Sequence, residues 1–221
     1  MENTTTIYML LVSYTIIFLG FVIMNKLKPG IAFYQELKQN NLPVLNCFHC
    51  ILILIMLMPT WTIKTQPVFL LIFPDRMTIA QATAFLISFG LISFLPWKKF
   101  TRQTAEDVSL PVIRVSVYAS LRIIFLMAYE WFFRGVLLLG LCNWLGTLLG
   151  IAVNTFLYVT VHLHKKRNEM LGCIPLGILL CIFTLWWQSI WPAIIFHLQV
   201  AIINEWPALQ QFLPPQKQTA L

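Results

Sequence analysis

The stretch Met127-Ala128-Tyr129-Glu130-Trp131-Phe132-Phe133-Arg134-Gly135 places a carboxylate and a guanidinium inside an apolar segment that runs from Pro111 to Leu141. A charged side chain at the centre of a membrane-spanning helix costs roughly 3 kcal/mol, and such residues usually face the bundle interior and pair with one another. Because Glu130 and Arg134 are four residues apart, a helix brings their side chains together. The pair is therefore either a structural ion pair or part of a functional site.

The composition of the whole chain agrees with a membrane setting. Of the 221 residues, 59% are hydrophobic and 10% are charged. A soluble domain carries about a quarter charged residues, and one core cannot hide this much apolar surface from water. We predict an all-α fold, a polytopic membrane helical bundle.

Apolar stretches near the length of about 20 residues that a spanning helix needs predict about seven transmembrane helices. They are Ile7–Met24, Val44–Ile63, Thr78–Trp97, Pro111–Leu141, Thr147–His164, Met170–Trp187 and Trp191 to about Trp206. Pro59 predicts a kink in the second, and Val68–Phe73 is too short to span. The chain divides into N-terminal helices and loops at 1–110, a core of four helices at 111–206 and a cytoplasmic tail at 207–221.

The positive charges in the loops predict the orientation, because cytoplasmic loops carry an excess of Lys and Arg. With the N-terminus outside, ten basic residues fall on the cytoplasmic side and two on the outer side. The cytoplasmic ones are Lys26, Lys28, Lys38, Lys98, Lys99, Arg102, Lys165, Lys166, Arg167 and Lys217; the outer ones are Lys64 and Arg76. We predict N-out/C-in topology, with Ile31–Leu42 along the cytoplasmic surface. The net charge of +7 is explained by membrane lipids, and no nucleic-acid partner is expected.

No catalytic or metal-binding role is predicted for the cysteines, and no cleavage is predicted for the N-terminal helix. Ile7–Met24 is expected to be a retained helix, because basic residues follow it and none precede it. The cysteines, which are Cys47, Cys50, Cys142, Cys173 and Cys181, are expected to be small packed residues. Cys47-Phe48-His49-Cys50 has no second pair to complete a zinc site.

Three polar side chains of the C-terminal half are expected at similar depth. Glu130 lies about 12 residues before the turn at Cys142–Gly146 and His162 about 16 residues after it, so both lie roughly 18 to 24 Å from that turn. They can meet across antiparallel helices. His197 lies about six residues, roughly 9 Å, beyond its own turn, and reaches them only if its helix is tilted or its loop recessed.

A carboxylate that faces a histidine can activate water. Glu130 would accept the proton while His162 orients the water or protonates the leaving amine, and His197 would donate to the oxyanion. Arg134 would keep Glu130 ionised. The alternative is that His162 and His164 are interfacial residues and His197 an interhelical hydrogen-bond partner.

These residues resemble the CPBP family, which includes the type II CAAX prenyl endopeptidases and bacteriocin-processing or self-immunity membrane proteins. The family pattern is Glu-Glu-x-x-x-Arg, then an aromatic four residues before a His, then His-x-x-x-Asn. Tyr129 to Gly135 is similar to the first motif, Tyr158-Val159-Thr160-Val161-His162 to the second, and His197 to the start of the third. Gly177 and Ser189 to Ala193 add to the resemblance, which covers roughly Pro111 to Asn204.

The chain departs from the family pattern at two positions. The first Glu is Tyr129 and the Asn is Ala201. The resemblance implies that the first Glu and the second-motif His activate water, and that the third-motif His and Asn stabilise the oxyanion. A tyrosine with a reference pKa of about 10 is a poor general base, so Glu130 would have to replace it. Asn204, almost two turns after His197, would supply the missing amide.

The sequence therefore predicts an intramembrane endopeptidase that cuts a membrane-proximal, lipidated or leader-bearing peptide, with Glu130, His162, His197, Arg134, Asn204 and Tyr129 in the site. The alternative is a catalytically inactive scaffold or self-immunity protein, and a transporter is less well supported because paired broken helices are not evident. No cofactor is expected; zinc held by Glu130, His162 and His197 is the alternative. The predicted location is a bacterial plasma membrane. The substrate and the oligomeric state stay open.

The basic residues next to His162 predict which side of the membrane reaches it. A cysteine introduced beside His162 should react with a membrane-impermeant thiol reagent from the cytoplasmic side, because Lys165, Lys166 and Arg167 are expected there. Labelling from the outside alone would overturn the predicted topology.

Overall fold

The computed structural model describes residues 2–27, 42–62, 81, 83, 87, 111–163 and 167–210. Within these ranges the secondary structure is helical, and they contain no strand. The chain is an all-α helical membrane bundle, as predicted. The predicted surface segment Ile31–Leu42 lies outside the described residues except for Leu42, which is buried at the start of the second helix. The short apolar stretch Val68–Phe73 and almost all of the predicted span Thr78–Trp97 also lie outside them.

The N-terminal part contributes two described helices. Helix α1 (Glu2–Leu27) contains the first predicted span, and α2 (Leu42–Leu57) contains most of the second. From Met58 to Thr62 the chain tightens into the 3-10 helix η1. Pro59 lies in this segment, and a proline cannot donate the backbone hydrogen bond that would continue an α-helix. The α-helix thus ends next to Pro59, and the kink predicted there stays a prediction.

The centre of the bundle is one continuous helix of 34 residues from Val112 to Leu145. It consists of α4 (Val112–Glu130), the π-helical segment η3 (Trp131–Leu137) and α5 (Leu138–Leu145). It ends at Gly146, whose φ of 82° lies in the left-handed region that glycine adopts without strain. Every residue of η3 is buried. This segment is therefore enclosed by its neighbours on all sides.

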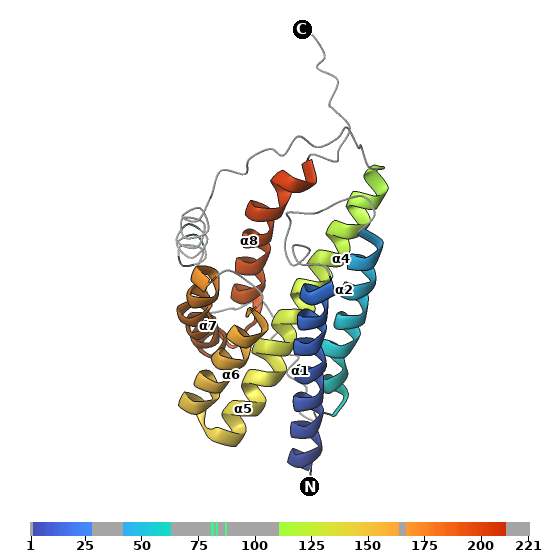
Figure 1. Cartoon of the computed structure of the whole chain (residues 1–221). Helices are drawn as coiled ribbons and strands as arrows, with labels where there is room; N and C mark the ends of the chain where they lie inside the picture. The colour runs from blue at the N-terminus through green and yellow to red at the C-terminus, as the bar shows by residue number, and fades with distance from the viewer. Residues whose placement is uncertain are drawn as a thin grey trace.

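Three further helices surround the central one. They are α6 (Thr147–Val161), α7 (Arg167–Trp187) and α8 (Trp191–Gln210). In Figure 1, α1 and α2 lie along one side of α4, while α6 and α7 lie on the other side and α8 packs against α4 and α7. Helix α8 begins at about mid-height of the bundle, well above the turn between α5 and α6. The connection before α8 is therefore recessed.

The number of membrane spans is only partly answered by helix length. Among the described residues, four helical stretches are long enough and apolar enough to cross a membrane. They are Thr5–Lys26, Leu42–Thr60, Val112–Leu145 and Met170–Trp187. The apolar parts of α6 and α8, Thr147–Val161 and Trp191–Ile203, are shorter. The count of seven spans stays a prediction.

The surface is apolar and the interior holds the polar groups, the arrangement expected for a protein surrounded by lipid. Leu54, Leu148 and Trp186 are more than 70% exposed, at 71%, 82% and 72%. The buried polar side chains, in contrast, are Ser13, His49, Glu130, Arg134, Asn154, Thr155, His162, Thr184 and Ser189. In lipid such groups must find partners inside the bundle. They therefore mark where the helices interact specifically.

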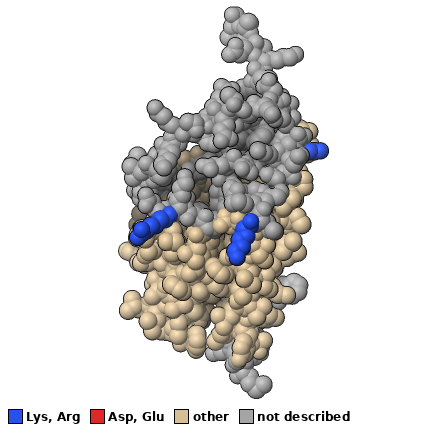
Figure 2. Space-filling model, in the orientation of Figure 1, with Lys and Arg blue, Asp and Glu red and all other residues tan. Residues whose placement is uncertain are grey.

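The exposed basic side chains of the described residues lie near the ends of helices. Lys26, Arg114 and Arg167 are exposed near the ends of α1, α4 and α7. Figure 2 shows basic side chains at about mid-height of this face and higher, and no acidic side chain among the coloured atoms. This distribution is compatible with the predicted cytoplasmic ends of these helices. The N-out/C-in orientation itself stays a prediction.

The Cys47-Phe48-His49-Cys50 motif does not form a cluster. Cys47 and Cys50 are exposed, whereas His49 is buried with its ring 4.8 Å from that of Phe125 on α4. The prediction that the cysteines are packed holds for Cys173 and Cys181, which are buried, and is wrong for Cys47 and Cys50. The reason is that α2 uses its other face to contact the bundle.

Close packing of α5 on α6 yields a test of the fold. A Cβ atom on Gly150 would lie 2.8 Å from the backbone of Cys142, whereas one on Gly172 would meet nothing within 4 Å. Gly150→Ala should lower the free energy of unfolding by about 1–3 kcal/mol, because the helices must separate. Gly172→Ala should be neutral or stabilise the helix by up to about 1 kcal/mol. Thermal unfolding in detergent measures both; equal effects would contradict the predicted contact.

Candidate active site

Glu130 and Arg134 form the predicted pair at the start of the π segment. Both side chains are fully buried, and Arg134 Nε lies 3.5 Å from Glu130 Oε2. A buried charge is tolerated when an opposite charge and hydrogen bonds offset its lost hydration. Glu130 and Arg134 form such a pair inside the bundle, so the opposite charges offset much of the free energy that burying either one alone would cost.

His197 makes the closest contact with the carboxylate. Its Nδ1 atom lies 2.5 Å from Glu130 Oε1. A carboxylate can only accept, so Nδ1 carries the proton and faces Glu130. The recessed start of α8 supplies the depth that His197 needs to reach this position (Figure 1). The histidine that seemed too shallow from the sequence is therefore the direct partner of Glu130.

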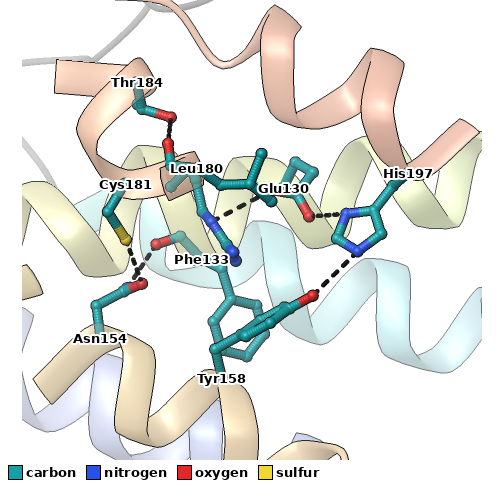
Figure 3. A network of polar contacts seen from close by, with 9 residues as sticks. Glu130, Phe133, Asn154, Tyr158, Leu180, Cys181, Thr184 and His197 are labelled. Carbon is teal, nitrogen blue, oxygen red and sulfur yellow. Dashed lines mark hydrogen bonds and ion pairs between the residues drawn. The ribbon is translucent and has the colours of Figure 1, made fainter. Parts of the chain in front are cut away.

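Tyr158 closes the group on its other side. Its hydroxyl lies 3.2 Å from His197 Nε2, and the guanidinium of Arg134 lies 4.2 Å from the centre of its ring. Glu130, Arg134, Tyr158 and His197 thus form a closed circuit, called here the Glu130 network. Figure 3 shows its contacts from Glu130 to His197 and from His197 to Tyr158. An arginine over an aromatic face gains a favourable cation–π interaction. The network therefore joins the end of α4 and η3 to α6 and α8.

His162 lies next to this network at the end of α6. Its Nδ1 atom lies 2.8 Å from the backbone oxygen of Tyr158, and its ring centre lies 4.6 Å from the Tyr158 ring. A carbonyl oxygen only accepts, so Nδ1–H donates and the neutral ring carries its lone pair on Nε2. The sequence predicts that Glu130 faces His162. In the structure the histidine in closest contact with Glu130 is His197.

Tyr129 lies between the two imidazoles. Its ring is edge-on to His162 and His197, with centre distances of 6.4 and 5.9 Å. The hydroxyl is buried and has no hydrogen-bond partner among the described residues. An unsatisfied buried hydroxyl costs about 1–3 kcal/mol. Such a cost is common where a side chain serves a bound substrate.

The remaining predicted residues are less informative. Ala201 packs against the main hydrophobic core and has no side-chain donor. Asn204 lies within α8, but its side chain is outside the described part of the chain, as is all of His164. Among the described residues, no group of three His, Cys, Asp or Glu side chains is arranged to hold a metal ion. The role of Asn204 and the absence of a cofactor stay predictions.

Sequence reasoning missed the polar function of Tyr158 and of Asn154. Asn154 is fully buried on α6, and its amide nitrogen lies 2.7 Å from the backbone oxygen of Phe133. Asn154, Tyr158 and His162 recur every four residues in a predominantly apolar segment. That spacing places them on one helix face. It is the signal that predicts a polar stripe facing the central helix.

Comparison with known proteins identifies the segment that holds this site. Residues 111–203 match the family model described as Type II CAAX prenyl endopeptidase Rce1-like. This segment is similar to that family over 93 of the 221 residues of the chain, counted from 111 to 203. The match confirms the resemblance predicted from the motifs, and the CPBP segment contains Glu130, Arg134, His162 and His197. No curated protein and no solved structure matches the chain.

The Glu130–Arg134 pair yields a test of the network. Arg134→Met should lower the free energy of unfolding by about 3–5 kcal/mol, because it leaves a buried carboxylate without its cation. The double variant Arg134→Met with Glu130→Gln should cost less than the single one, since no net charge remains buried. Unfolding in detergent compares them, with Arg114→Met, an exposed arginine, as the control expected within about 0.5 kcal/mol of wild type. A double variant that is less stable than Arg134→Met would contradict the pairing.

Proposed function

We propose that this protein is an intramembrane endopeptidase that uses water to cut a peptide bond of a membrane-associated substrate. The observation that carries the proposal is the meeting of Glu130, His162 and His197 with Tyr129 inside a segment of a protease family. Both histidines have Nδ1 against an acceptor. Each imidazole is therefore oriented, which is the arrangement that general acid–base catalysis requires.

His162 is the general base of the proposed reaction. Its Nε2 takes one proton from water while the water oxygen bonds to the scissile carbonyl carbon, and the carbonyl becomes an oxyanion. When the tetrahedral intermediate collapses, the carbon–nitrogen bond breaks and His162 returns the proton to the leaving amine. Glu130 acts through His197, because its carboxylate faces Nδ1 of that ring. This division differs from the sequence-based assignment, in which Glu130 itself accepts the proton.

The oxyanion is stabilised by Tyr129 and His197. The hydroxyl of Tyr129 is a buried donor beside both imidazoles, and a preorganised donor at a developing oxyanion is worth about 3–4 kcal/mol. With a second proton on Nε2, His197 donates to the oxyanion from that nitrogen, in place of its contact with Tyr158 at 3.2 Å. In this scheme Tyr129 supplies the hydrogen bond that an alanine at position 201 cannot make.

The substrate is proposed to be a lipidated or leader-bearing peptide presented at the membrane. His162 is 8% exposed and lies where α6 ends, close in sequence to the exposed Arg167 at the start of α7. This favours entry from the predicted cytoplasmic side. The membrane is proposed to be a bacterial plasma membrane, and the reaction to need no metal ion.

A second function is favoured by one observation. Glu130 is fully buried and contacts both Arg134 and His197, as expected of a purely structural ion-pair network. In that case the protein is a catalytically inactive family member that acts as a scaffold or self-immunity protein. The two functions differ in whether the wild-type protein cleaves a peptide.

Cleavage in membranes tests the proposal. His162→Ala should abolish turnover, and Glu130→Gln and His197→Ala should each lower kcat by about 100-fold or more, because general acid–base catalysis contributes about 10²–10⁴-fold. The substrates are a prenylated C-terminal peptide and a leader-bearing peptide, added with and without a chelator. The control is His49→Phe, which removes a buried histidine outside the CPBP segment. Wild-type cleavage that survives all three site substitutions at matched folded protein would refute the site.

Substitutions of Tyr129 separate the two functions. Tyr129→Phe should lower kcat by about 10²–10³-fold if the hydroxyl serves the oxyanion, with little change in stability because that hydroxyl has no partner among the described residues. Tyr129→Glu restores the family pattern. Activity that appears only in Tyr129→Glu would support the inactive-member interpretation.

A further inference from the structure

The π-helical segment next to Glu130 has an unusual backbone hydrogen-bond pattern. In η3 the N–H of Leu138 donates to the oxygen of Phe133, five residues earlier. A π-helix of this kind is rare and is found mostly at functional sites. The same Phe133 oxygen also accepts the amide of Asn154 on α6, at 2.7 Å. One carbonyl thus receives donors from two helices.

Asn154 is itself held by a third helix. Its side-chain oxygen lies 3.2 Å from Sγ of Cys181 on α7, and both residues are fully buried. Cys181, Asn154 and the Phe133 carbonyl therefore form a chain of hydrogen bonds from α7 through α6 to η3 (Figure 3). A buried amide is costly without partners. Here it has a donor and an acceptor contact.

The position of this chain links it to the Glu130 network. Phe133 directly precedes Arg134, and its ring lies 4.5 Å from that of Tyr129 and 5.9 Å from that of Tyr158. The segment begins at Trp131, immediately after Glu130. If it returned to α-helix, the register would shift by one residue, a rotation of about 100°. Glu130 and Arg134 would then no longer point at the same neighbours.

We propose that Asn154 is a positioning residue that holds η3 in its π-helical form and so sets the Glu130–Arg134–His197 geometry. The catalytic purpose of that geometry rests on the proposed function. The effect of Asn154 on the geometry does not rest on the proposed function, since it concerns only which atoms face Glu130. Asn154 forms hydrogen bonds with Phe133 and Cys181, and it acts on Glu130 through the Phe133 carbonyl.

The experiment compares full-length variants in detergent or lipid nanodiscs. Asn154→Leu removes both polar groups of the amide and keeps a branched side chain, whereas Asn154→Asp, in its neutral acid form, retains a donor for Phe133 and an acceptor for Cys181. Thr184→Val is the control, because Thr184 is also fully buried but bonds only to Leu180 within its own helix in the contacts described. The readouts are the ¹⁵N resonances of His197, assigned with His197→Gln, and kcat and KM for peptide cleavage.

We expect Asn154→Leu to shift the His197 resonances and to lower kcat by about 10- to 100-fold with KM within about twofold, since a small misplacement of catalytic groups has this effect. Asn154→Asp should restore both, and Thr184→Val should change neither. Cys181→Ala should produce a weaker form of the Asn154→Leu effect, and Cys181→Ser should resemble wild type.

A folded Asn154→Leu protein with unchanged His197 resonances would overturn the proposal. If Asn154→Leu does not fold, Cys181→Ala decides the matter, because unchanged resonances in that folded variant would equally overturn it. A wild-type protein without peptidase activity, whose His197 resonances nonetheless shift in Asn154→Leu, would refute the proposed function and support the positioning role. The two ideas therefore fail in distinguishable ways.

Discussion

The buried carboxylate of Glu130 is the constraint on which the rest of the C-terminal bundle depends. It is enclosed by protein and is compensated by Arg134 on the same helix and by His197 on α8. In lipid no water is available to hydrate a charge that loses its partner. The helices that carry its partners must therefore keep their depth and rotation relative to η3. The buried charges of this segment cost free energy, and they also specify the depth and rotation at which the helices pack.

Two features allow the helices to satisfy this constraint. Glycines permit close approach, since a Cβ on Gly150 would collide with α5 and one on Gly177 would lie 3.1 Å from Thr155 and 3.2 Å from Tyr158. Small residues are the usual means of helix association in membranes, where the hydrophobic effect between helices is weak. The π segment then supplies a carbonyl that Asn154 can reach. Packing and hydrogen bonding together hold Tyr158 against Arg134 and His197.

Much of the fold and part of the site were predictable from the sequence. The all-α membrane class follows from apolar runs, the helix break at Pro59 from the missing N–H, and the Glu130–Arg134 pair from four-residue spacing. The choice of histidine was not predictable. Counting residues from each turn placed His162 level with Glu130 and His197 too shallow, because the counting assumes that all turns lie at one depth. That assumption is wrong for α8, which begins at a recessed position, so that His197 reaches the depth of Glu130 (Figure 1).

The sequence by itself determined that the protein is an apolar helical bundle with a few charged and polar residues inside it. It also determined that the C-terminal segment carries motifs similar to those of the CPBP family. These properties depend on composition and on spacing within one helix, which are local. Only the tertiary structure decided that His197 faces Glu130, that the Tyr158 hydroxyl closes the network and that η3 is π-helical with Asn154 on its carbonyl. Each of these depends on the register between helices far apart in the chain. That register is set by packing and interhelical hydrogen bonds, which no periodicity within a single helix records.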